Sequence, residues 1–182
     1  MALAVIIGLS AWLASRPIPA EKNPPRRVSL EEVRLTLYPE QDPEARWVFE
    51  AGRAEQDPAT RQMEIQSMKS GARYLGNKLD LRLYASRVSI DSNDNITTPV
   101  ARVEILKGCY TVELGEEGSP PVYINQTNGF RAPAVHITSP TLEVKARNFV
   151  SDFAIKNPTW GDGKDTFRDG DPQPCTITGG QS

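Results

Sequence analysis

The sequence has only one histidine, His136, and only two cysteines, Cys109 and Cys175, among 182 residues. Metal sites and catalytic triads that need several histidines are therefore excluded. The two cysteines form neither a CxxC redox pair nor a zinc-binding pattern. No GxSxG elbow and no glycine-rich phosphate loop is present. The sequence predicts no metal site, no cofactor and no catalytic residue, and we expect a protein that is not an enzyme.

The chain also has no large excess of one charge sign and no high hydrophobic content. Lysine and arginine number 21 against 23 aspartates and glutamates, so the formal net charge is −2. Without a basic excess, the chain has little attraction for the phosphates of nucleic acid, and we expect no such partner. Hydrophobic residues make up 38% of the chain, too few for a protein with several membrane spans.

The two cysteines leave two possibilities open. In an oxidising compartment Cys109 and Cys175 could form one disulfide that closes a long loop. In a reducing compartment they would be one buried thiol and one thiol in the C-terminal tail. The sequence alone does not decide between these possibilities.

The long apolar run lies at the N-terminus, where residues 1–14 carry no charged side chain. A helix of this length spans about 21 Å, which is short for a bilayer core of about 30 Å. No basic residue precedes the run and no small-x-small cleavage motif follows it, while several basic residues come directly after it. We predict a helical membrane anchor over residues 1–15 and a proline-rich linker over 16–28. The alternatives are a cleaved signal segment and a start assigned too far downstream.

Residues 29–157 are predicted to form antiparallel strands, because apolar and polar residues alternate with a period of two. The alternating apolar positions are Val33, Leu35, Leu37, Trp47, Phe49, Ala51, Met63, Ile65, Leu79, Leu81, Leu83, Ala85, Val103, Ile105, Val112, Leu114, Leu142, Val144 and Ala146. Turn residues separate these runs, for example at 56–59, 91–95 and 128–129. Between Ala85 and Val88 the parity changes, which predicts a bulge or a bend. Such a one-sided sheet must fold on itself, and its inner face is either a dry core or a groove for an acyl chain.

The remaining polar clusters favour surface structure over chemistry. His136 alternates with apolar neighbours and is expected on the outer face of a strand. The run 91–95 (DSNDN) lacks the glycine and the final glutamate of a calcium loop, so we predict a hairpin turn. Residues 158–182 are rich in Gly, Pro and Asp and are predicted to form a flexible tail without a metal site.

The runs Ala45–Ala54 (ARWVFEAGRA) and Leu79–Ser89 (LDLRLYASRVS) resemble those of the periplasmic lipopolysaccharide-export proteins of the LptC and LptA/OstA-like type. The first contains the W-x-x-x-A-x-x-A pattern of these proteins, and the second ends in A-x-x-V. The segment Ile96–Leu106 is a further candidate unit. The similarity covers roughly residues 30–150, and the N-terminal apolar segment makes the chain most like the C component of the system.

This resemblance implies an all-β fold, namely a single β-jellyroll that is V-shaped and open along one side. It further implies a lipid carrier on the periplasmic face of the inner membrane. The expected partners are the permease subunits of an ABC transporter, another jellyroll protein and the lipid itself. Edge-strand pairing is expected near Val33–Leu37 and Leu142–Phe149. The expected lipid-groove residues are Trp47, Phe49, Leu81, Leu83, Val103, Ile105 and Val144. The alternative function is a structural or assembly subunit of a cell-envelope complex, with the same sheet as a dry scaffold.

Overall fold

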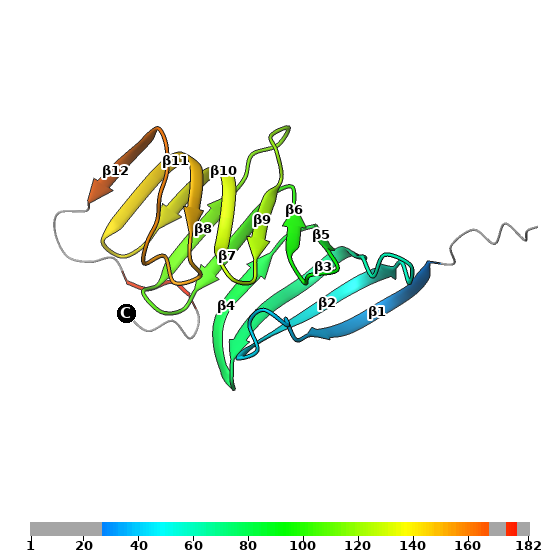
Figure 1. Cartoon of the computed structure of the whole chain (residues 1–182). Helices are drawn as coiled ribbons and strands as arrows, with labels where there is room; N and C mark the ends of the chain where they lie inside the picture. The colour runs from blue at the N-terminus through cyan, green and yellow to red at the C-terminus, as the bar shows by residue number, and fades with distance from the viewer. Residues whose placement is uncertain (1–26, 168–173, 178–182) are drawn as a thin grey trace, which may run out of the picture.

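The computed structural model describes residues 27–167 and 174–177, in which all regular structure is β-strand (Figure 1). The strands are β1 (Val28–Leu37), β2 (Ala45–Gln56), β3 (Met63–Leu75), β4 (Lys78–Tyr84), β5 (Arg87–Ile90), β6 (Ile96–Thr98), β7 (Ala101–Ile105), β8 (Tyr110–Leu114), β9 (Val122–Asn125), β10 (Gly129–Thr138), β11 (Leu142–Ser151) and β12 (Gly163–Phe167). Every pairing between them is antiparallel. The all-β, antiparallel prediction is confirmed. The predicted helix at residues 1–15 lies outside the described residues.

The long strands β3 and β10 each belong to two half-sheets. The C-terminal part of β3 pairs with β4, and the order continues through β7 and β8 to the C-terminal part of β10. We call this half-sheet A, and it includes the N-terminal part of β2, which pairs with the C-terminal part of β3. The N-terminal part of β3 pairs with β5, and the order continues through β6 and β9 to the N-terminal part of β10, which forms half-sheet B. The pairing thus closes a ring of eight strands, which β1 and β2 extend at one end and β11 and β12 at the other.

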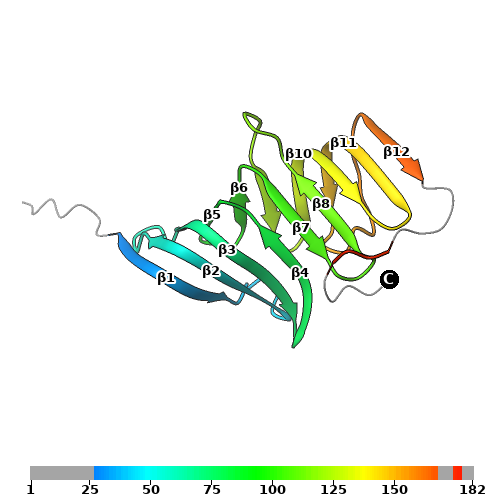
Figure 2. The ribbon, with the colours of Figure 1, turned by 180° about the vertical axis from the view of Figure 1, so that it is seen from behind.

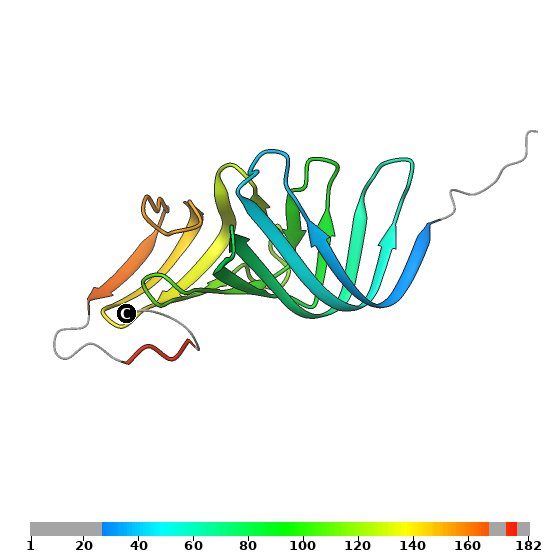
Figure 3. The same cartoon turned by 90° about the horizontal axis from the view of Figure 1, so that it is seen from below.

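The long strands turn from one half-sheet into the other at aligned bends. Glu32 in β1 and Ser67 in β3 both have positive φ, 48° and 52°. Gly52 in β2 lies beside them, where a Cβ would come within 3.2 Å of the Ser67 Cβ. Viewed from below, β1 to β3 curve into a U (Figure 3). At the opposite end of the sheet (Figure 2), β11 bends at Asn148, which has a φ of 54°.

The core lies between the two half-sheets, since the alternating apolar residues of both face inward. Its fully buried large side chains include Trp47, Phe49, Phe130, Phe149, Ile65, Leu81, Leu83, Ile96, Ile105, Leu114, Ile124 and Ile137. The predicted change of parity between Ala85 and Val88 coincides with the break between β4 and β5. The long strands pass through the bend without interruption. At the same place the chain between β4 and β5 breaks into two consecutive short strands, one in each half-sheet.

Three features differ from the sequence-based expectations. The sheet is not simply open along one side, because backbone pairing closes the eight-strand ring. Leu142–Phe149 is not a free edge, because β12 pairs with Leu142–Ala146 and the N–H and C=O of Val150 bond to Thr159. A strand also forms within the predicted tail at Gly163–Phe167 and pairs with β11. The sequence of this segment lacks the apolar alternation that would predict a strand.

Candidate functional site

The seven expected groove residues all lie in the core between the half-sheets. Their relative exposure is 0–1%, and all belong to the same apolar cluster. They are Trp47 and Phe49 on β2, Leu81 and Leu83 on β4, Val103 and Ile105 on β7, and Val144 on β11. The alternation therefore placed them together on the inner face. In the structure, protein side chains fill the space around them.

Opposite the bends, the turns of the two half-sheets meet along a line that we call the mouth. The turn 38–44 on half-sheet A contacts the turns 91–95 and 126–128 on half-sheet B. The Trp47 indole Nε1 donates a hydrogen bond of 3.0 Å to Gln126 Oε1. Gln126 Nε2 donates in turn to the Asp94 carbonyl at 2.7 Å. The Thr127 hydroxyl and Gln41 Oε1 are 3.0 Å apart, so side chains from both half-sheets close this line.

A buried arginine lies at the mouth on half-sheet A. Arg73 of β3 pairs with Trp47 of β2 and with Leu81 of β4, and it is 5% exposed. Its Nη2 bonds to an Asp42 carboxylate oxygen at 2.5 Å, and its Nη1 bonds to Asp80. Arg73 is not among the site residues that the sequence predicts. The sequence contains one indication of its position. Arg73 is an even number of residues from Ile65, so the alternation along the strand places this charged residue on the inner face.

An aromatic ring from the other side of the molecule covers this arginine. Phe153 lies in the loop 152–158, which follows β11. The Arg73 Cζ is 4.2 Å from its ring centre. The ring also makes edge contacts with Trp47 at 6.2 Å and with Phe130 of half-sheet B at 5.2 Å. Phe153 therefore fills the space between the two half-sheets at the mouth.

The β1 end of the sheet leaves apolar surface uncovered. Leu30 pairs with the buried Ala54, so it lies on the inner face, yet it is 46% exposed. Val28 on the same face is 47% exposed. Further along β1, Leu35 is only partly buried. Among the described strands, β1 pairs only with β2, so its outer backbone edge is free. The apolar inner face thus continues to an unpaired edge.

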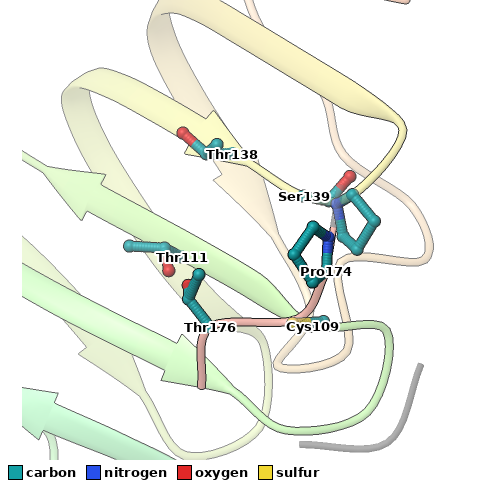
Figure 4. A pocket seen from close by; sticks show the side chains of 7 residues that line it. Cys109, Thr111, Thr138, Ser139, Pro174 and Thr176 are labelled. Atoms are coloured by element: carbon teal, nitrogen blue, oxygen red, sulfur yellow. The ribbon is translucent and has the colours of Figure 1, made fainter. Parts of the chain in front are cut away.

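The two cysteines are joined in the structure. Cys109, in the turn between β7 and β8, forms a disulfide with Cys175, and their Cα atoms are 5.8 Å apart. The bond holds residues 174–177 against half-sheet A, where Ile177 is buried. Beside it, Thr111, Thr138, Ser139, Pro174 and Thr176 line a small, shallow hollow (Figure 4).

Several titratable side chains on the outer face form ion pairs and local networks. The His136 ring nitrogens lie 3.2 Å from a Glu113 oxygen and 2.9 Å from a Glu143 oxygen, across three neighbouring strands. Burial and the neighbouring Glu104 carboxylate raise the pKa of Tyr84. The run 91–95 is a turn in which Asp91 Oδ1 accepts bonds from two following amides.

No protein-family model and no curated protein sequence matches this chain. Over residues 27–167 and 174–177, no helix has the length and apolar character needed to cross a bilayer.

Proposed function

We propose that the chain is a non-catalytic bridge protein that carries lipopolysaccharide-like lipid between an inner-membrane ABC transporter and a further jellyroll protein. The observation that carries this proposal is the continuous apolar inner face, which runs from the core to the free edge at β1. Shielding an acyl chain from water is worth about 0.8 kcal/mol per CH₂. A folded sheet with this face can supply that shielding without covalent chemistry.

In this proposal the sheet acts as a V-shaped jellyroll folded along the aligned bends. Its opening would be the mouth, since only side chains and turns join the half-sheets there. The interior is filled, so a lipid would enter only when the mouth separates. The seven inward residues from Trp47 to Val144 would then contact the acyl chains.

The free edge of β1 would bind a partner strand. Unpaired N–H and C=O groups can add a strand from another chain by β-augmentation. The exposed Val28 and Leu30 favour this role, because a partner jellyroll would cover them. The permease subunits and the next jellyroll protein are the proposed partners.

The Cys109–Cys175 disulfide supports a location outside the reducing cytosol. Disulfides persist in oxidising compartments such as the periplasm. We therefore propose the periplasmic face of the inner membrane, with residues 1–15 as the anchor or as a cleaved signal segment.

Site-specific photocrosslinking tests the carrier function. Benzoylphenylalanine replaces Leu35, on the inner face near the free edge, or Thr36, which is exposed on the outer face, as the matched control. After irradiation with purified lipopolysaccharide, we expect a lipid adduct at position 35 and none at position 36. Equal labelling at both positions, or none at position 35, would contradict the proposal.

The complete burial of the expected groove residues favours a second candidate. A filled interior suits a structural or assembly subunit of a cell-envelope complex that uses the sheet as a dry scaffold. This alternative predicts no lipid adduct at position 35, together with a stable stoichiometric complex with envelope proteins.

A further inference from the structure

We propose that the loop 152–158 is the gate of the lipid site, with Phe153 as a plug that an acyl chain must displace. This inference rests on the proposed carrier function. Phe153 contacts Trp47 and Arg73 on half-sheet A and Phe130 on half-sheet B. Its ring therefore lies where an acyl chain entering through the mouth would first meet the core.

The loop is built to move as one unit between fixed ends. The Asp152 carboxylate accepts bonds from the amides of Ala154 at 3.1 Å and Lys156 at 2.9 Å, which makes the loop compact. Its two ends are joined by paired 2.8 Å bonds between the backbones of Val150 and Thr159. Displacement of the loop can thus remove Phe153 from the mouth while β11 keeps its pairing.

The closed position carries strain that favours release. Ile155 has a φ of 53°, a conformation that a β-branched residue rarely adopts. Such strain is concentrated at ligand clamps and switch regions. Among the described side chains, Arg73 Nε and Ser151 Oγ are buried without a hydrogen-bond partner. The Arg73 guanidinium lies beneath the Phe153 ring, and Ser151 directly precedes the loop.

The contacts along the mouth would hold the half-sheets together while the gate is closed. Trp47 bonds to Gln126, and the side chains of Gln41 and Thr127 meet beside them. Entry of an acyl chain requires Phe153 to leave and these turns to separate. The route and the plug can therefore be tested separately.

The probe is cis-parinaric acid, a fatty acid whose fluorescence rises in an apolar environment, mixed with the full chain in a stopped-flow instrument. Phe153→Ala removes the plug, and we expect uptake about tenfold faster than in the wild type. Tyr123→Ala removes an aromatic ring that is 48% exposed on the outer face of β9, and it should leave the rate unchanged. Circular dichroism of each variant confirms that it is folded.

A clamp tests the route. Gln41→Cys and Thr127→Cys are combined and joined with a short bis-maleimide while the native disulfide stays intact. We expect uptake about tenfold slower in the cross-linked double variant than in the same double variant before cross-linking. If the wild type takes up the probe and neither cross-linking nor Phe153→Ala changes the rate, the gate is overturned and the carrier function is not. Slowing by the clamp without acceleration by Phe153→Ala would also overturn the role of Phe153. Absence of uptake in every variant would overturn the carrier function itself, and the gate with it.

Discussion

The guanidinium group of Arg73 lies against the ring of Phe153, with 4.2 Å between Cζ and the ring centre. The same group bonds to two aspartates, Asp42 and Asp80, whose side chains are 19% and 22% exposed. An almost fully buried cation is thus held by two carboxylates and one aromatic face. These contacts tie the end of β3 to the turn 38–44, to β4 and to the loop after β11.

The first prediction concerns the stability that this cation provides. Arg73→Leu leaves Asp42 and Asp80 without their partner, and we expect unfolding to become easier by about 2–3 kcal/mol. Urea denaturation followed by circular dichroism measures this loss. Arg102→Leu is the control, because Arg102 pairs with Glu104 while its side chain is 55% exposed. That change should cost less than about 1 kcal/mol. Equal losses in the two variants would refute a special contribution from Arg73.

The second prediction concerns the disulfide, whose cysteines are 66 residues apart. In the chain-entropy model, a loop of this length stabilises the fold by about 4 kcal/mol. Replacing both Cys109 and Cys175 by Ser should lower the Tm by about 8–16 °C, which calorimetry can measure. Reduction of the wild type should lower its Tm equally, while the double variant should not respond to reductant. A Tm that is the same in both proteins would show that the bond does not constrain unfolding.

Two turn glycines provide the third prediction. Gly129 and Gly76 both have positive φ, 84° and 56°. A Cβ on Gly129 would lie 2.3 Å from the Ser151 carbonyl oxygen, whereas a Cβ on Gly76 would meet nothing within 4 Å. Gly76→Ala should therefore cost about 1 kcal/mol for the backbone conformation alone. Gly129→Ala should cost about 3 kcal/mol or more, because backbone atoms must move as well. Thermal unfolding of both variants checks the difference, and equal costs would contradict it.

The sequence predicts the strands well because period-two alternation reflects which face is buried. Trp47 and Phe49 on β2, and Leu81 and Leu83 on β4, follow directly from this rule. The pairing of β12 with β11 does not follow from the rule, since Gly163–Phe167 has no apolar alternation. The alternation also does not predict that the sheet closes. Closure depends on which parts of β3 and β10 pair with the short strands.

The mouth was the least predictable part of the candidate site. Arg73 and Phe153 are far apart in the sequence and lie beside no recognisable motif. Their contact depends on how a loop after β11 folds back to the end of β3. Local patterns carry no information about such a tertiary contact. A charged residue in phase with the inward face was the single clue.

The last prediction tests the free edge of β1. Leu30 lies on the inner face and is 46% exposed, so Leu30→Lys should change stability by no more than about 0.5 kcal/mol. A lysine on the inner face of an edge strand opposes the addition of another strand. We therefore expect the amount of the proposed partner protein that copurifies with the tagged chain to fall about tenfold, which corresponds to about 1.4 kcal/mol. Quantitative mass spectrometry of the purified complex measures this change.

Thr36→Lys is the matched control for this experiment, because it adds the same charge to the same strand but on the exposed outer face. It should leave copurification unchanged. Equal loss in both variants would mean that added charge alone weakens the complex, and no loss in either would mean that β1 does not bind the partner. A loss confined to Leu30→Lys would require the partner to cover the inner face at the edge. That result is expected if the proposed partner continues both the sheet and its apolar interior.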